Sequence, residues 1–244
     1  MTDAWLLEIF SSIQGEATWL GRRQIFIRFG CCNRSCAYCD TSVEPSPNCR
    51  VERKPGEGAF VEVPNPVSWP RLRQIITSWI QAAPRSHHSI SITGGEPLLQ
   101  VDTLRQWLPA LRSLLPIYLE TNGTLPAVLE ELLPHLDYIA MDIKLASMTG
   151  EPTPWQAHGD FLRLAAGKEG CVKIVIDQGV DTEELEQAAA MAAVHGPGLP
   201  VILQPRSGGS SLPGAVLMKF QEQLARLHPD VRVIPQMHRF MGLL

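Results

Sequence analysis

The chain has 244 residues, of which 45% are hydrophobic and 19% charged, and its formal net charge is -4. This length and composition predict one globular domain over residues 1–244. The acidic surplus argues against binding to nucleic-acid polymers or anionic membranes, which requires a basic surface. The N-terminus lacks a signal-peptide pattern and no apolar run approaches about 20 residues, so a cytoplasmic protein is expected.

Short apolar runs rich in Ile and Val alternate with amphipathic segments along nearly the whole chain. The apolar runs predict strands at 25–29, 89–93, 117–121, 138–144, 172–177, 201–204 and 231–235. The amphipathic segments predict helices at 69–82, 101–115, 127–133, 155–166, 182–195 and 212–227. This alternation is typical of an α/β fold built from right-handed βαβ units with a parallel sheet. An open or partial barrel and a flat doubly wound sheet both fit the pattern.

Residues 42–67 interrupt the alternation. The segment contains five prolines together with Gly56 and Gly58, so an irregular insertion is predicted, in which a small hairpin around 59–63 is one option. Because it directly follows a cysteine-rich loop, the segment could border a functional site. A surface insertion without a functional role fits the sequence equally well.

The cysteine-rich loop follows the predicted strand 25–29. Cys32, Cys36 and Cys39 form a C-x3-C-x2-C pattern. In a reducing compartment such clustering indicates a metal or an iron–sulfur cluster, because structural disulfides are rare there. Three thiolates leave one iron of a [4Fe–4S] cluster without a protein ligand. That iron can chelate the amino and carboxylate groups of S-adenosylmethionine (SAM).

A structural zinc site is the alternative, and it would need a fourth ligand. The side chain of Cys31 is expected to diverge from that of its neighbour Cys32. Cys49 could fold back from the segment 42–67, so a zinc site stays open at this point. Cys171 begins a predicted strand and is interpreted as an ordinary buried cysteine.

A second motif, Thr93-Gly94-Gly95-Glu96-Pro97, follows a predicted strand and precedes a helix. Glycines at this position let the backbone approach a ligand closely, and Glu96 could accept hydrogen bonds from an ammonium group. The motif alone also suits a tight βα turn. Together with the cysteine loop, it resembles the segment that holds the SAM amino group in radical SAM proteins.

Further motifs extend the resemblance along the chain, in order. The matching segments are 8–16 (EIFSSIQGE), 26–28, 32–41, 93–97, 119–124 (LETNGT), 142–144 (DIK), 172–175, 203–205 and 231–238 (VRVIPQMH). The sequence thereby resembles the 7-carboxy-7-deazaguanine synthase family, radical SAM enzymes of queuosine and 7-deazapurine biosynthesis. The motifs at 13–16 and 235–238 separate this family from generic radical SAM proteins.

The resemblance implies a homodimer with a partial (β/α) barrel, reduced to a (β6/α3)-like core. It implies three cofactors: a [4Fe–4S] cluster, SAM and Mg2+. The implied reaction is that of a carbon–nitrogen lyase, which contracts the ring of 6-carboxy-5,6,7,8-tetrahydropterin to give 7-carboxy-7-deazaguanine and ammonia. A 5′-deoxyadenosyl radical would start it by taking a hydrogen atom from C6, after reduction by a donor such as flavodoxin or ferredoxin.

The resemblance also implies roles for individual positions, none of them a general acid or base. The implied metal ligands are Cys32, Cys36 and Cys39 for the cluster and Thr41 for Mg2+. The implied cofactor-binding residues are Tyr38, Gly95, Glu96, Asp142, Ile143, Lys144 and Gln204. The implied substrate-binding residues are Ile13, Gln14, Gly15, Arg28, Thr93 and His238.

Some of these positions have simpler interpretations. Arg28 could form a structural ion pair, and His238 could be a surface histidine. Glu120 and Asn122 are expected to stabilise the loop at the barrel mouth. For the whole chain, another radical SAM enzyme, such as a glycyl-radical activase, would share the cysteine loop but lack the terminal motifs. A zinc-binding interaction module would need four ligands.

Overall fold

The computed structural model describes residues 2–39, 41, 46–208 and 212–243. Its strands form one ten-stranded sheet in the order β10-β9-β8-β7-β6-β5-β2-β1-β3-β4. The strands are β1 (Leu6–Ile13), β2 (Arg23–Phe29), β3 (Asn48–Glu52), β4 (Phe60–Pro64), β5 (Ser89–Gly94), β6 (Ile117–Thr121), β7 (Tyr138–Asp142), β8 (Glu169–Ile176), β9 (Val201–Pro205) and β10 (Val231–Val233). Neighbouring strands from β2 to β10 are parallel, whereas β1 runs antiparallel to β2.

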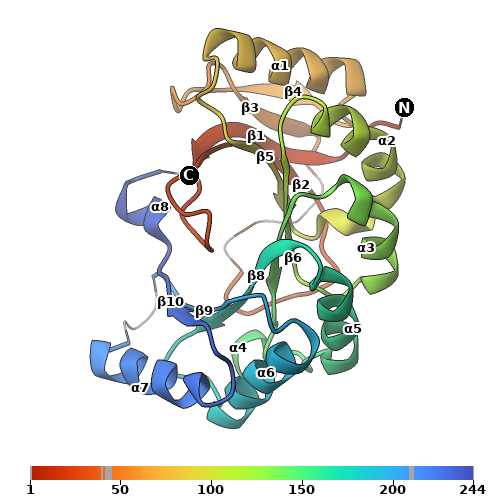
Figure 1. Cartoon of the computed structure of the whole chain (residues 1–244). Coiled ribbons are helices and arrows are strands. Elements are labelled where there is room, and N and C mark those ends of the chain that lie inside the picture. Colours follow the sequence, from red (N-terminus) through yellow and green to blue (C-terminus); the bar gives the residue numbers. More distant parts are fainter. Residues whose placement is uncertain (1, 40, 42–45, 209–211, 244) are drawn as a thin grey trace.

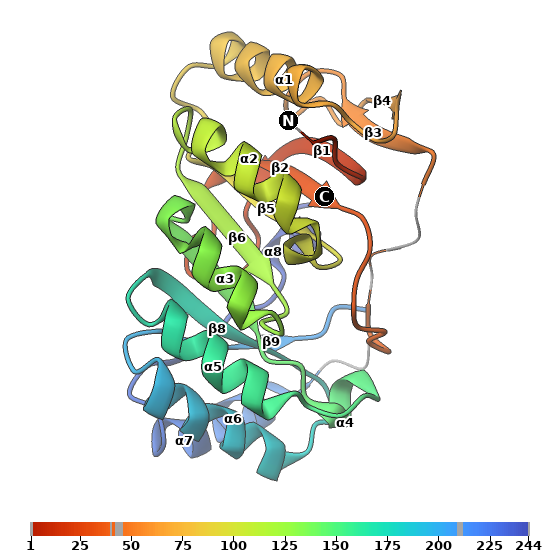
Figure 2. The same ribbon diagram turned by 90° about the vertical axis from the view of Figure 1, so that its right-hand side faces the viewer.

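The sheet curves around a central space, and the longer helices cover its outer side (Figure 1). These helices are α1 (Trp69–Ala82), α2 (Val101–Arg112), α3 (Pro126–Leu132), α5 (Trp155–Ala165), α6 (Thr182–His195) and α7 (Gly214–Ala225). Shorter turns are α4 (Ala146–Thr149), α8 (Met237–Phe240), η1 (Pro97–Gln100) and η2 (Leu133–His135). The side view shows the long helices stacked in one layer outside the strands (Figure 2). Right-handed crossovers place successive helices on the same face of a parallel sheet, and the predicted partial (β/α) barrel is confirmed.

The outer face of the sheet packs against one stripe of each helix. The most deeply buried residues of α2 are Leu104, Trp107, Leu108 and Leu111. Their spacing of three and four residues places them on one side of the helix. The ring centroids of Trp107 and of Trp69 on α1 lie 5.7 Å apart, so the two helices share one core.

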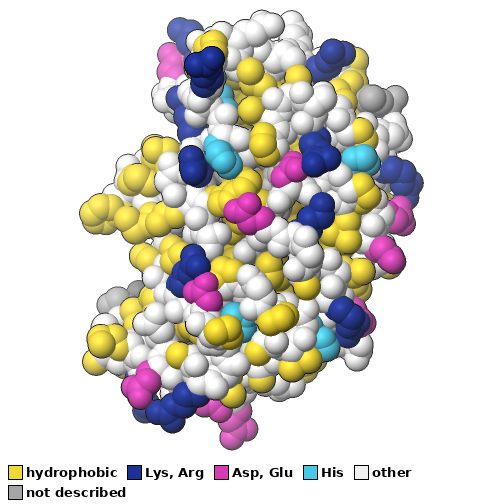
Figure 3. Space-filling view, viewed as in Figure 1, with side chains coloured by type: hydrophobic (Ala, Val, Ile, Leu, Met, Phe, Trp, Pro, Cys, Tyr) yellow, Lys and Arg dark blue, Asp and Glu magenta, His cyan; other side chains and the backbone are white. Residues whose placement is uncertain are grey.

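A second buried cluster closes the barrel at the amino ends of its strands. It consists of Ala17, Tyr118, Tyr138, Ala140, Cys171 and Ile202, with Trp19 and Ile234 packed against it. The rings of Tyr118 and Tyr138 stack across adjacent strands, with centroids 4.6 Å apart. Seen from the direction of Figure 1, side chains fill the centre of the ring of strands (Figure 3). As predicted, Cys171 is an ordinary buried residue.

All the predicted strands and helices are present, with bounds that differ by a few residues. Strand β1 was not predicted, and neither was β3. The segment 42–67 is more regular than predicted, because β3 and β4 form an antiparallel hairpin that continues the sheet beyond β1. Residues 42–45 lie outside the described residues.

The helices differ from the reduced set of three that the resemblance implied. Each crossover between the parallel strands carries a helix, beginning with α1 between β2 and β5 and ending with α7 between β9 and β10.

None of the helices in the described ranges combines the length and the apolar character needed to cross a lipid bilayer.

Candidate active site

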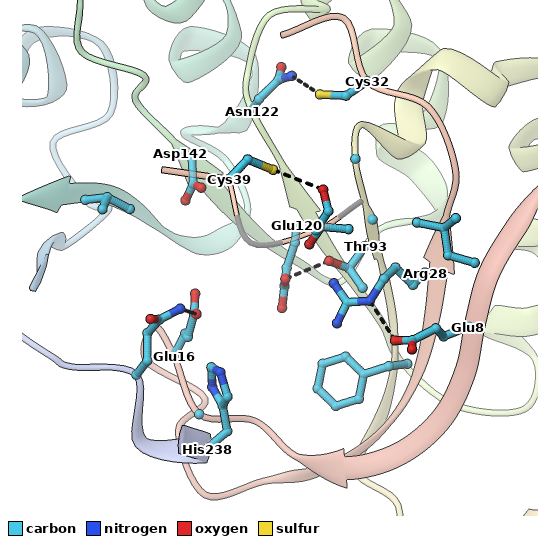
Figure 4. A pocket seen from close by; sticks show the side chains of 18 of the residues that line it. Glu8, Glu16, Arg28, Cys32, Cys39, Thr93, Glu120, Asn122, Asp142 and His238 are labelled. Carbon is cyan, nitrogen blue, oxygen red and sulfur yellow. Dashed lines mark hydrogen bonds and ion pairs between the residues drawn. The ribbon is translucent and has the colours of Figure 1, made fainter. Parts of the chain in front are cut away.

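A cavity of about 880 Å³ lies inside the barrel, toward the carboxyl ends of its strands. Ligands of parallel α/β folds bind at this end, because the loops that follow the strands converge there. Three segments far apart in the sequence line the cavity: residues 13–16, the cysteine loop, and residues 236, 238 and 239. Figure 4 shows their side chains around one space, with Cys32 at one end and His238 at the other.

The cysteine loop presents three thiols to this cavity. Cys32, Cys36 and Cys39 all line it, and all three are reduced. Backbone hydrogen bonds fix the loop: the N–H of Ala37 donates to the carbonyl of Thr149 at 2.9 Å, and that of Cys39 to the carbonyl of Cys36 at 3.0 Å. Burial raises the pKa of the Cys32 and Cys36 thiols.

The other candidate thiols lie elsewhere. Cys31 has a positive φ of 69° and does not line the cavity; its carbonyl accepts a hydrogen bond from the N–H of Glu96. Cys49 is fully buried in β3, where burial raises the pKa of its thiol to about 12. Within the described ranges, no three His, Cys, Asp or Glu side chains are grouped as a single metal ion requires. This arrangement disfavours the zinc site, since neither cysteine joins the triad.

The glycine motif after β5 lies against the start of the cysteine loop. Gly94 has a φ of 140°, and a Cβ there would lie 2.8 Å from the carbonyl carbon of Phe29. Only glycine therefore fits between β5 and β2 at this point. The next residue, Gly95, for which a cofactor contact was predicted, lines the cavity.

Glu96 lies behind the cavity wall. Its carboxylate is fully buried and accepts hydrogen bonds from the N–H of Leu98, the hydroxyl of Thr121 and the N–H of Asn122. Burial raises its pKa to about 7, although these donors and Lys144 partly oppose the shift. Ile143, also predicted to bind the cofactor, is likewise buried and does not line the cavity.

Four charged side chains form a network on one wall of the cavity. The ammonium group of Lys144 donates to Asp142 at 2.7 Å and lies 5.3 Å from the ring centroid of Tyr38. Lys173 pairs with Glu16 and lies 3.2 Å from Asp142. Burial alone would raise the pKa of Glu16, but the Lys173 ammonium group holds it at about 2. Glu16 and the two lysines therefore stay charged at neutral pH.

A second set of polar side chains forms hydrogen bonds between the ends of β1, β5 and β6. The carboxylate of Glu120 accepts hydrogen bonds from the Gln14 amide and from the Thr93 hydroxyl, both at 2.8 Å. Burial raises the pKa of Glu120. Gln14 also donates to Gln24 at 3.0 Å. All but Gln24 line the cavity, so Glu120 lies at the site and not only at the barrel-mouth loop where it was predicted.

The predicted substrate residues from the two ends of the chain meet. The N–H of Met237 donates to the carbonyl of Gly15 at 2.8 Å, which places His238 directly against Gly15. Ile13 lines the same part of the cavity. His238 is thus part of the cavity wall.

Arg28 forms an ion pair with Glu8 and also faces the cavity. Its Nε donates to Glu8 at 3.3 Å, and its guanidinium lies 5.5 Å from the ring centroid of Phe10. The structural ion pair considered from the sequence is therefore present. Figure 4 shows the two terminal nitrogens pointing away from Glu8 into the cavity. Thr41, the predicted Mg2+ ligand, also lines the cavity, and its carbonyl accepts a hydrogen bond from the Cys39 thiol at 3.4 Å.

The chain is similar in sequence to proteins of a known family. Residues 26–192 match the Radical SAM superfamily. The chain is 44% identical over 245 residues to the 7-carboxy-7-deazaguanine synthase of Geobacter sulfurreducens, with 99% of this chain and 98% of the relative covered. The chain belongs to the 7-carboxy-7-deazaguanine synthase family.

A second and more distant relative is also a 7-carboxy-7-deazaguanine synthase. The synthase of Methanothermobacter thermautotrophicus is 34% identical over 264 residues, with 98% of this chain and 97% of the relative covered. Among solved structures, QueE from Escherichia coli is similar at a TM-score of 0.59 and 19% identity, with 96% of this chain and 94% of that chain covered. At this identity, the structural match supports the fold.

As a radical SAM protein of this family, the chain uses a [4Fe–4S] cluster and SAM. The residues present fit both groups. Three thiols face one cavity, as a cluster with one open iron requires. Gln204 also lines the cavity, and its Oε1 is buried without a hydrogen bond from any described residue. A buried acceptor of this kind can take a donor from a ligand.

Sequence reasoning assigned no binding role to several charged residues of the synthase cavity, among them Glu8, Glu16, Arg50 and Lys173. Lys173 carried a signal, because a lone lysine inside the apolar run VKIVI is buried only when it is paired. Glu8 and Glu16 lie within motifs used for the resemblance, but nothing in their spacing predicts their partners.

Proposed function

We propose that this chain converts 6-carboxy-5,6,7,8-tetrahydropterin to 7-carboxy-7-deazaguanine with release of ammonia. One observation carries the proposal: Gly15 and His238 meet on the cavity that the three cysteines face. A radical SAM enzyme of another activity, such as a glycyl-radical activase, needs the cysteines but not this contact.

We assign the cluster to Cys32, Cys36 and Cys39. When bound, the cluster and SAM supply a carbon-centred radical that takes a hydrogen atom from the substrate. The SAM contacts would come from Tyr38, Gly95, Asp142, Lys144 and Gln204, all of which line the cavity. Glu96 and Ile143 would support them from behind the wall. The role of the chain is to position the reacting carbon and to exclude water.

The substrate assignment concerns a second set of residues that line the cavity. The residues are Ile13, Gln14, Gly15, Arg28, Thr93 and His238, with Glu120 added from the structure. The planar fork of Arg28 suits a carboxylate. The Glu120 carboxylate can accept from the ring N–H groups of a pterin. Thr41 would hold Mg2+, together with substrate and water oxygens, in the oxygen-rich shell that this ion prefers.

We also propose that the enzyme is a cytoplasmic homodimer that takes electrons from a flavodoxin or ferredoxin. Support for a dimer comes from an apolar surface at α8, where Phe240 is 85% exposed and Met241 and Leu243 are also exposed. Figure 3 shows hydrophobic side chains on the edge of the molecule where α8 lies. Light scattering of wild type and Phe240→Ser tests this: a dimer that becomes a monomer in the variant is expected, and a monomeric wild type would contradict it.

The experiment for the reaction is anaerobic turnover. Reconstituted protein is incubated with SAM, dithionite, Mg2+ and the carboxytetrahydropterin, and the products are separated by chromatography. Formation of 7-carboxy-7-deazaguanine and an equal amount of ammonia is expected. If the cluster is intact and SAM binds, yet neither product forms, the assignment fails.

A further inference from the structure

Three charged residues lie in one row across adjacent strands on the cavity side of the sheet. In the strand register, Glu8 of β1 pairs with Arg28 of β2 on one side and with Arg50 of β3 on the other. All three side chains line the cavity. The Glu8 carboxylate therefore connects Arg50 on the β3–β4 hairpin to Arg28, which faces the cavity.

The Glu8 carboxylate is shared between the two guanidinium groups. Its Oε1 accepts from Arg50 Nη1 at 2.5 Å, and its Oε2 accepts from Arg28 Nε at 3.3 Å. Glu8 is 15% exposed and Arg28 24%, whereas Arg50 is 51% exposed. The Arg50 guanidinium also lies 4.4 Å from the ring centroid of Phe60 on β4, which fixes its direction.

We propose that Arg50 is a positioning residue that orients Arg28 through Glu8. Without Arg50, both oxygens of Glu8 would be available to Arg28 for a bidentate pair, which is the preferred geometry of arginine and a carboxylate. With Arg50 on Oε1, Arg28 is held by Nε, and its terminal nitrogens point into the cavity (Figure 4). The row also carries one excess positive charge, which favours an anionic ligand. This inference rests on the proposed function for the nature of that ligand, a pterin carboxylate.

A purely structural role predicts a different outcome. An ion pair with a half-exposed arginine contributes little to folding stability, because solvent screens it. If Arg50 only stabilised the fold, its substitution would lower the free energy of unfolding slightly. It would change the affinity for all ligands equally. If Arg50 positions Arg28, its substitution lowers the affinity for carboxylated ligands alone, and only while Glu8 is present.

The test measures binding of two probes to cluster-loaded protein by pterin fluorescence: 6-carboxypterin and pterin, which lacks the carboxylate. For Arg50→Gln, the Kd of 6-carboxypterin is expected to rise about fivefold, and that of pterin to stay unchanged. Arg50→Lys restores most of the affinity, because a single contact to Glu8 Oε1 is retained. Arg53→Gln is the matched control: it removes an exposed arginine from the same hairpin, outside the cavity lining.

A double-mutant cycle tests the route through Glu8. In the Glu8→Gln background, Arg50→Gln is expected to produce no further loss of 6-carboxypterin affinity. Equal loss in both backgrounds would mean that Arg50 acts directly, and unchanged binding in Arg50→Gln would mean that it has no role; either result overturns the proposal. Failure of wild type to bind 6-carboxypterin overturns it as well. Wild type that binds in this pattern but does not turn over would refute the proposed reaction and leave the role of Arg50 intact.

Discussion

Gly15 is packed so closely against His238 that a Cβ at position 15 would lie 2.6 Å from the Cβ of His238. The hydrogen bond from Met237 to the carbonyl of Gly15 holds the two segments together. A glycine at position 15 is therefore required by the close approach of a second segment, and not by backbone torsion. The fit between these two segments completes the wall of the cavity.

Gly15→Ala is expected to displace His238 and to lower kcat/KM by at least tenfold, because a shift of about 1 Å in a binding group has large effects on catalysis. Cluster content and the unfolding temperature should remain near those of wild type. Gly167→Ala is the control, since nothing lies within 4 Å of a Cβ at that position. Equal activity of both variants would show that the contact is not needed.

The six cysteines are expected to separate into two groups after anaerobic reconstitution. Cys36→Ser should lose the cluster, whereas Cys49→Ser and Cys31→Ser should retain about four irons and four sulfides per chain. The reason is that Cys36 faces the cavity, while Cys31 and Cys49 do not line it. Iron and acid-labile sulfide assays provide the measurement. Bound zinc that disappears in Cys49→Ser would favour the zinc-binding module instead.

Removal of Lys173 is expected to lower the free energy of unfolding by about 3 kcal/mol, because it leaves the largely buried carboxylate of Glu16 without its cation, whereas Asp142 keeps its pair with Lys144. Urea unfolding of Lys173→Met measures the loss, with exposed Lys219→Met as a control near zero. The double variant Lys173→Met/Glu16→Gln should recover part of the stability. Loss without any recovery would show that packing, and not charge, is responsible.

Glu96 predicts a pH dependence of folding in the cofactor-free protein. Its folded pKa of about 7 lies above the usual glutamate value of 4.5, so its contribution to stability is fully present below pH 4.5 and is lost as the pH rises through 7. Relative to Glu96→Gln, wild type should lose about 2 kcal/mol between pH 5 and pH 8. Urea unfolding at intervals of one pH unit gives the two curves. Parallel curves would contradict a buried carboxyl group that ionises in this range.

Much of the fold was predictable because strands of a parallel sheet are buried on both faces and appear as continuous apolar runs. Strand β1 lacks that signal: it contains Ser11 and Ser12 and pairs antiparallel to β2, outside the βαβ pattern. Strands β3 and β4 were hidden by prolines, which here lie in the segments around the hairpin strands or at the end of β4. Irregular composition in a segment therefore does not exclude a short hairpin within it.

The site was predictable where chemistry depends on local spacing, as for Cys32, Cys36 and Cys39. It was not predictable where it depends on contacts across strands. The pairs Glu120–Gln14 and Lys173–Glu16 join residues far apart in sequence, and no local rule relates them. The position of Glu96 was also not predictable from its motif: its carboxylate accepts hydrogen bonds from neighbouring segments behind the cavity wall.

The contact between Met237 and Gly15 joins segments near the two ends of the chain, so it can form only after residue 237 has left the ribosome. The cysteine loop and β5 leave the ribosome early, and the parallel strands with their helices can pack as they emerge. The thiols can therefore be in place to receive iron and sulfide while residues 236–239 are still unsynthesised. A nascent chain stalled before residue 236 is expected to acquire a cluster but to bind no pterin, so cofactor loading precedes completion of the substrate site.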